Sequence, residues 1–157
     1  MAVRKIPPGH NSVSPYLIVD GAARALDFYT EAFGAVELFR VTTPTGTVGH
    51  AEVRIGDTVV MLADVHPDVG AHAPAHYGGS PISLHVYVED VDAVARRAIA
   101  AGAKVKRPVA VELVGNRLGT LEDPFGHTWH ISTHIEDVSS EELDRRMKAT
   151  AARQGQG

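Results

Sequence analysis

The stretch LEDPFGHTWHISTH, residues 121–134, decides the fold of this chain. Its DPFG segment predicts a tight turn, because proline presets φ at the second position and glycine accepts a positive φ at the exit. The residues from 127 to 134 are rich in β-branched and aromatic side chains and predict a strand. Alternate side chains of a strand share a face, and in this strand one face is polar and the other is mostly apolar. The polar face either lines a pocket or faces water. The polar face holds Thr128, His130, Ser132 and His134, and the apolar face holds Trp129, Ile131 and Thr133.

Composition excludes several classes of protein. The 157 residues suffice for one ordinary domain or two small fused modules, and 44% hydrophobic and 22% charged residues are typical of a globular chain. A net charge of −4 gives no reason to expect nucleic acid as a partner. With no cysteine, disulfides, thiolate metal sites and a cysteine nucleophile are excluded. Neither a signal peptide nor an apolar run of bilayer length is visible, so we expect no membrane association and a cytoplasmic location.

The two halves of the chain repeat the order strand–helix–strand–strand–strand. Val19 and Val88 are 69 residues apart, and Gly34 and Gly102 are 68 apart, at corresponding places in the repeat. The first helix is expected to begin with Asp20 as its cap and to end at Gly34, and the second to begin with Asp90 as its cap. The expected strands are residues 12–19, 35–43, 49–55, 58–63, 82–88, 104–112, 117–121 and 127–134, and the expected helices are 22–33 and 91–101.

This repeat predicts an α+β fold. A single βαβββ unit cannot bury both faces of its sheet, so two tandem modules are expected to form a cupped mixed sheet with the helices outside. The inner face of such a cup is a natural small-molecule site. We expect one domain overall, divided into a first module at 12–64, a linker loop at 65–80, a second module at 81–137, and a C-terminal helix and tail at 138–157.

The paired βαβββ order, the segment Leu17–Tyr29 and the sequence DPFGHTW resemble the vicinal oxygen chelate superfamily, which includes glyoxalase I, bleomycin-resistance proteins and extradiol dioxygenases. The segments His50–Asp64, Ser83–Ala93 and Asp123–Ser139 are similar to its PhnB-like branch. The resemblance implies a cup that binds a small molecule. It also implies a homodimer, because this fold commonly completes its cups between chains. It does not fix the chemistry, since one scaffold hosts many functions.

The metal site of the superfamily is not recognisable in this sequence. In metal-dependent members, His, Glu or Gln ligands come from the first, fourth, fifth and last strands. The resemblance places those ligands at Ser14, Met61, Ser83 and His130, of which only His130 is a competent ligand for the usual divalent ions. We therefore expect no metal at this site and no cofactor. A divalent metal could instead bind a displaced set of ligands, if all of them face one cup. The members of this displaced metal set are His50, Glu52, His85 and His130.

Strand alternation also selects candidate ligand-binding residues. The Gly56-Asp57 connection predicts a hairpin in which Glu52 lies opposite Met61. Glu52 is then either a desolvated general base or the partner of a neighbouring Arg or His. Arg117 either binds an anion or forms a surface ion pair. The residues expected to line the cup are Tyr16, His50, Glu52, Arg54, Met61, Ser83, His85, Tyr87 and His130.

Two functions are compatible with these patterns. The leading hypothesis is a protein that binds a small organic molecule in its cup without the usual divalent metal. The alternative is a lyase, isomerase or dioxygenase acting on a small oxygenated substrate. It would use either the displaced metal set or Glu52 and His130 as acid–base groups.

Overall fold

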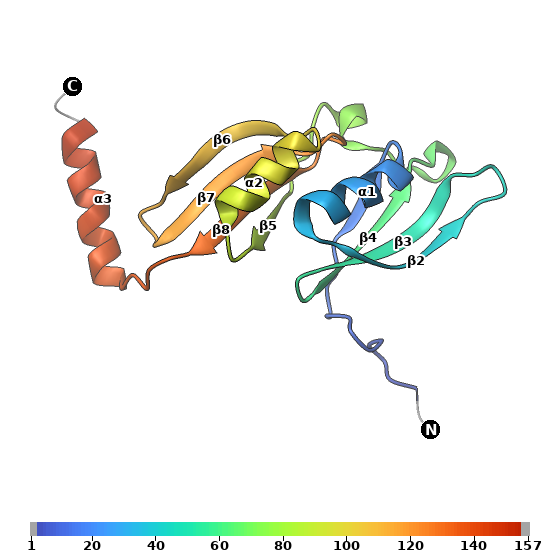
Figure 1. The fold of residues 1–157 in the computed structure, drawn as a ribbon, viewed down its shortest axis with the longest axis horizontal. Coiled ribbons are helices and arrows are strands. Elements are labelled where there is room, and N and C mark those ends of the chain that lie inside the picture. Colours follow the sequence, from blue (N-terminus) through green and yellow to red (C-terminus); the bar gives the residue numbers. More distant parts are fainter. Residues whose placement is uncertain (1–2, 155–157) are drawn as a thin grey trace.

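Two four-stranded sheets, each with a helix packed against it, form the body of the chain (Figure 1). The computed structural model describes residues 3–154. The first module consists of β1 (Tyr16–Val19), α1 (Ala22–Phe33), β2 (Val36–Thr42), β3 (Val48–Ile55) and β4 (Thr58–Asp64). The second consists of β5 (Ser83–Tyr87), α2 (Val91–Ala100), β6 (Lys104–Val111), β7 (Asn116–Glu122) and β8 (Thr128–His134). Helix α3 (Ser140–Gln154) projects from the end of the second module (Figure 1).

Both sheets have the same topology, which confirms the predicted α+β fold of two tandem βαβββ modules. The strand orders are β1-β4-β3-β2 and β5-β8-β7-β6. In each sheet the first pair is parallel and the other pairs are antiparallel, so the sheets are mixed. In the described residues no hydrogen-bonded ladder joins one sheet to the other. Strands β1 and β5 are therefore edge strands of two separate sheets, and Pro15 stands directly before an edge, as expected.

The predicted β3–β4 hairpin has the predicted register. Glu52 pairs with Met61, and Ile55 pairs with Thr58 beside the two-residue connection. This register directs Ala51 and Val53 into the core, where both are fully buried. Glu52 therefore belongs to the opposite face, because a shift of one residue would exchange the two faces of the strand.

One hydrophobic core serves both modules. Helices α1 and α2 contact each other and lie side by side over the sheets (Figure 1). The buried cluster includes Tyr29 from α1 together with Trp129 and Ile131 from β8. The ring centroids of Tyr29 and Trp129 are 5.5 Å apart. Trp129 is thus a core residue, as expected from its place on the apolar face of β8.

The start of α1 differs from the prediction. Gly21, at φ 101°, precedes the helix, and the side chain of Asp20 does not cap it. Instead, Asp64 at the end of β4 accepts hydrogen bonds from the backbone N–H groups of Gly21 and Ala22, at 3.0 and 2.7 Å. The left-handed glycine turns the chain so that these N–H groups meet β4 rather than the preceding residue. The predicted cap of α2 is confirmed, because Asp90 accepts from the N–H of Ala93 at 2.9 Å.

The segment between the modules has local structure of its own. It contains two 3-10 turns, Pro67–Val69 and Pro74–Tyr77, and a bridge between His66 and Ala71. Pro74 is buried, and a Cβ built on Gly126 would lie 3.0 Å from it. The segment is therefore packed against the DPFG turn. None of the described helices is long and apolar enough to cross a membrane.

Candidate functional site

The DPFG turn forms as predicted, and its aspartate does more than shape the turn. Gly126 donates its N–H to the carbonyl of Asp123 at 3.1 Å, at φ 89°. The buried Asp123 carboxylate accepts four further hydrogen bonds, from Tyr29 Oη at 2.7 Å and from Trp129 Nε1, Phe125 N and His127 N at 2.9 Å each. Burial, followed by the adjacent Asp123 charge and hydrogen bond, raises the pKa of Tyr29 well above its ordinary value. Asp123 therefore ties α1 to the turn before β8.

The polar face of β8 meets β5 and β7 in a hydrogen-bonded set that we call the second-sheet cluster: Ser83, His85, Thr120, His130 and Ser132. His130 bonds Thr120 Oγ1 through Nδ1 at 2.9 Å and Ser83 Oγ through Nε2 at 3.0 Å. His85 Nε2 lies 2.6 Å from Ser132 Oγ. The two imidazole centroids are 5.9 Å apart. Burial and then the neighbouring His130 lower the pKa of His85.

A separate set lies on the face of the first sheet opposite α1, and we call it the first-sheet cluster: His10, Tyr16, His50 and Glu52. Tyr16 Oη is 2.8 Å from His50 Nδ1, and His50 Nε2 is 3.3 Å from Glu52 Oε1. The other carboxylate oxygen of Glu52 is 2.9 Å from His10 Nε2. Glu52 is 7% exposed, so these two imidazoles, rather than water, supply hydrogen bonds to both of its carboxylate oxygens.

His10 is the member that sequence reasoning missed. It lies in the N-terminal arm that precedes β1, and it reaches a residue 42 positions away. His10 precedes β1 by six positions, and no spacing rule connects it with β3. Residues 1–2 and 155–157 lie outside the described residues, so the predictions on the two ends of the chain are open there.

The displaced metal set is divided between the two clusters. His50 and Glu52 lie on the first sheet, whereas His85 and His130 lie on the second. Within residues 3–154, no three His, Cys, Asp or Glu side chains form a group that could hold a metal ion. The four positions suggested by the resemblance divide in the same way. Ser14 and Met61 line a cavity beside Glu52, and Ser83 binds His130.

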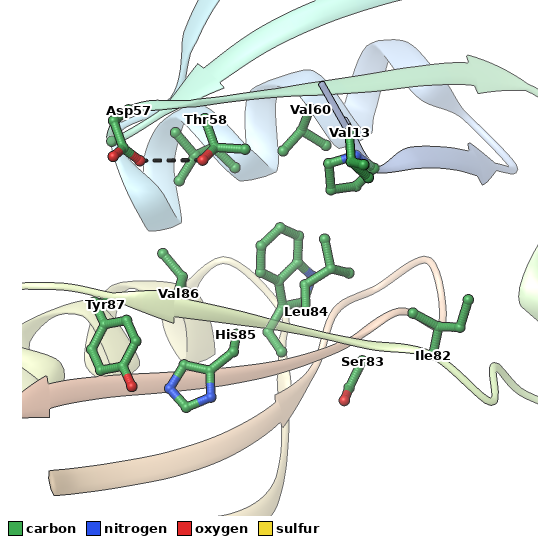
Figure 2. Close-up of a pocket in the computed structure, with 14 residues that line it drawn as sticks. Val13, Asp57, Thr58, Val60, Ile82, Ser83, Leu84, His85, Val86 and Tyr87 are labelled. Carbon is green, nitrogen blue, oxygen red and sulfur yellow. Dashed lines mark hydrogen bonds between the residues drawn. The ribbon is translucent and has the colours of Figure 1, made fainter. Parts of the chain in front are cut away.

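Several cavities border the strands that carry the two clusters. The one of about 750 Å³ lies between the β3–β4 hairpin and β5. In Figure 2, Val86 points into this gap between the modules, whereas Ser83, His85 and Tyr87 point away from it to the other side of β5. A cavity of about 500 Å³ adjoins Glu52 and is lined by Pro7, His10, Asn11, Ser12, Ser14, Phe39, Glu52 and Met61. A third cavity, of about 450 Å³, is bounded by Tyr16, Ile18, Thr43 and Thr47 among others.

The remaining candidates have separate positions. Arg117 donates to Asp92 from Nε and Nη2 at 2.8 Å each, which is the surface ion pair and not an anion site. Tyr87 stacks on His85 with centroids 4.7 Å apart, so it adjoins the second-sheet cluster. Arg54 is exposed on β3. His134, expected near a strand end, bonds Asn116 and Asp137 at 2.9 Å each.

Comparison with known proteins gives a consistent family. Residues 10–131 match the Glyoxalase/Bleomycin resistance protein/Dioxygenase superfamily. An uncharacterised protein of Mycobacterium bovis is 42% identical over 141 residues, which are 88% of this chain and 93% of that protein. The structure of a gene product from Arabidopsis thaliana is 26% identical, with a TM-score of 0.64, over 78% of this chain and 98% of that chain.

A Bacillus cereus structure, described as a putative 3-demethylubiquinone-9 3-methyltransferase, PhnB protein, is 21% identical. Its TM-score is 0.62, over 78% of this chain and 99% of that chain, and this similarity shows the fold. The family match covers most of the two modules, the first-sheet cluster and the second-sheet cluster except Ser132. The chain belongs to the Glyoxalase/Bleomycin resistance protein/Dioxygenase superfamily.

Proposed function

We propose that the protein binds a small oxygenated organic molecule on the open faces of its sheets, without the divalent metal site usual in its superfamily. The observation that carries this proposal is the pair of hydrogen-bonded polar clusters, each beside exposed aromatic side chains. Hydroxyl and imidazole groups offer both donors and acceptors, and Tyr16, Phe39 and Tyr87 supply flat apolar surface. Such a combination is typical of pockets for small organic ligands.

The side chains at the usual metal positions are poorly suited to a divalent ion. Of the four positions at which relatives hold a metal, Ser14, Met61 and Ser83 carry poor ligands for Zn, Ni, Mn or Fe. His130, the remaining one, has both ring nitrogens in hydrogen bonds to hydroxyl groups. We therefore expect these groups to meet the ligand directly.

We also propose that a homodimer completes the cup. The open face of the first module bears exposed apolar side chains along the whole of β2, with Phe39 at 46% and Val41 at 53% exposure. Strands β1 and β5 each have an unpaired edge. Pairing β1 of one copy with β5 of a second would bring the first-sheet cluster of one chain beside the second-sheet cluster of the other. The modules at 12–64 and 81–137 of one chain would then belong to two different cups.

Membership of the PhnB-like branch is part of the same proposal. The three sequence segments that resemble that branch fall on β3–β4, on β5–α2 and on β8 with its flanking turn. These elements carry six of the nine cluster residues: His50, Glu52, Ser83, His85, His130 and Ser132. The similarity to the Bacillus cereus structure supports the fold of the branch. A cytoplasmic location and the lack of nucleic-acid or membrane partners stay predictions.

The second candidate function is an acid–base enzyme of the superfamily, a lyase or isomerase. One observation favours it: the buried Glu52 carboxylate lies between two imidazoles and next to a cavity. A dioxygenase would need a metal. The displaced metal set could hold a metal ion only if a second chain brings the two clusters together.

Elemental analysis of tag-free protein, combined with light scattering at micromolar concentration, tests these proposals. We expect a dimer with less than about one metal ion per ten chains. Stoichiometric Zn, Ni, Mn or Fe that is lost in His85→Ala or His130→Ala would overturn the metal-free proposal. A monomer would overturn the shared cup.

A further inference from the structure

The first-sheet cluster is a continuous chain of hydrogen bonds rather than a set of separate pairs. It runs from Tyr16 Oη to His50 Nδ1 at 2.8 Å, from His50 Nε2 to Glu52 Oε1 at 3.3 Å, and from Glu52 Oε2 to His10 Nε2 at 2.9 Å. Glu52 is the most buried member of the chain, at 7% exposure, and Tyr16 at one end is the most exposed, at 49%. The side chains of His50 and His10 lie between these extremes, at 27% and 16% exposure, so Tyr16 is the member of the chain that is most open to a ligand.

The direction of each hydrogen bond follows from the chemistry of the groups. An ionised carboxylate only accepts, so His10 and His50 must both donate from Nε2 to Glu52. A neutral His50 that is protonated on Nε2 carries its lone pair on Nδ1. That lone pair accepts the hydroxyl proton of Tyr16. The oxygen lone pairs of Tyr16 then face solvent, and its hydroxyl proton is held by His50 Nδ1, which can act as a base.

We propose that Tyr16, His50 and Glu52 form a proton relay that deprotonates an O–H group of a small molecule bound on the first sheet. The ligand proton passes to Tyr16 Oη while the tyrosine proton passes to His50 Nδ1. The products are the ligand oxyanion and an imidazolium ion paired with the Glu52 carboxylate. No electron leaves the system, and the total charge is unchanged.

Each member has a distinct role. Tyr16 is the catalytic residue, because it alone contacts the ligand. His50 and Glu52 are positioning residues, since the imidazole takes the proton and the carboxylate fixes its tautomer and stabilises its charge. His10 binds the second oxygen of Glu52 and so prevents the carboxylate from rotating away.

The surroundings fit this role and indicate the class of substrate. Burial raises the pKa of Tyr16, so a free phenolate is disfavoured and the tyrosine proton must leave in concert with the arrival of the ligand proton. The adjoining cavity of about 450 Å³ combines apolar Ile18, Val48 and Ala63 with the hydroxyls of Thr43 and Thr47. It fits a compact alcohol, phenol or enol that is mostly apolar.

The inference rests on the proposed ligand site, but the relay can be tested without any ligand. N-acetylimidazole acetylates tyrosine: the phenolic oxygen attacks the acetyl carbon, imidazole leaves, and the phenolic proton goes to a base. Mass spectrometry then gives the rate at each tyrosine. Tyr77 and Tyr87 are internal controls, because they are more exposed, at 66% and 64%, and their hydroxyls have no hydrogen bond to a described residue.

We expect Tyr16 to react at least about tenfold faster than Tyr77, as general-base assistance requires. His50→Gln and Glu52→Gln should each remove this excess and leave the Tyr77 rate unchanged. Glu37→Gln, which makes the same change in charge on exposed β2, should keep the excess. A dilution series separates reactivity from coverage of Tyr16 by a second copy.

Nitrogen NMR of the histidines supplies a readout that does not depend on reactivity. It should show His50 protonated on Nε2, and Glu52→Gln should shift the population towards the other tautomer. The relay would be overturned if Tyr16 of the unsubstituted protein is acetylated no faster than Tyr77. It would also be overturned if the faster acetylation of Tyr16 survives in His50→Gln. Ligand binding that persists alongside such a result would leave the proposed function standing.

Discussion

The hydroxyl of Tyr29 donates to the carboxylate of Asp123 at 2.7 Å, across 94 positions of the sequence. Both side chains are buried, and the same carboxylate oxygen accepts from Trp129 Nε1. The contact fixes the helix of the first module to the strand that closes the second.

Asp123→Asn should destabilise the protein by about 3 kcal/mol. The amide would replace two acceptor oxygens with one acceptor and one donor, and the buried donors around it would lose charge-assisted hydrogen bonds. Tyr29→Phe, which removes a single partner, should cost about 1–2 kcal/mol. Urea denaturation measures both. Asp57→Asn, in the exposed hairpin, is the control, and an equal effect of Asp57→Asn and Asp123→Asn would refute the structural role.

Gly126→Ala should destabilise more than Gly46→Ala. Both glycines have nearly the same positive φ, 89° and 88°, so both alanines incur a similar backbone penalty of about 1 kcal/mol. Only at position 126 does the new Cβ lie 3.0 Å from Pro74, whereas nothing lies within 4 Å at position 46. The difference between the two thermal midpoints therefore measures how firmly the segment from 65 to 80 packs on the DPFG turn. Equal shifts would mean that this packing contributes nothing.

Stability should fall as pH decreases below about 6.5. The pKa of His85 is lowered from its ordinary value of 6.5 in the folded state by burial and by His130. In the window just below that value the unfolded chain binds more protons than the folded one, so acid favours unfolding. Denaturation midpoints between pH 7 and pH 5 provide the measurement. His85→Gln should flatten the slope, and an unchanged slope would contradict the assignment.

Helix α3 should lose its anchor in stronger acid. Hydrogen bonds from Arg145 and Arg146 lower the pKa of Glu142 to about 2 from 4.5. The corresponding stabilisation is complete above pH 4.5 and disappears as pH falls towards 2. Carbon chemical shifts should show the first turn of α3 melting in that range. Arg146→Gln should melt it at neutral pH as well, because Arg146 also bonds Glu136 and Leu113, whereas Arg153→Gln should not.

The sequence was sufficient for the repeat, the strand faces and the hairpin register, because each follows from local periodicity and turn chemistry. For example, Glu52 on β3 pairs with Met61 on β4, and Trp129 lies on the buried face of β8 while His130 lies on the other face. The cap of α1 was not predictable in this way. The donor groups of Gly21 and Ala22 are satisfied by Asp64, which is distant in sequence and arrives through the parallel pairing of β1 with β4.

The candidate site was predicted in parts but not as a whole. Strand alternation correctly placed His50 with Glu52 and His85 with His130 on shared faces. It could not show that these pairs lie on two separate sheets, because the gap between β1 and β5 depends on how the modules pack. It also missed His10, since a contact from an arm without secondary structure leaves no periodic signal.

The most direct test of the account is NMR mapping of fragment binding in the presence of a chelator. Small oxygenated aromatic fragments should shift the signals of Tyr16, His50, His85 and His130, with chelator present. The opposite result would be binding that disappears with chelator, or shifts confined to Val60, Leu84 and Val86 in the gap between the modules. Either outcome would contradict a metal-free ligand site on the open faces of the sheets.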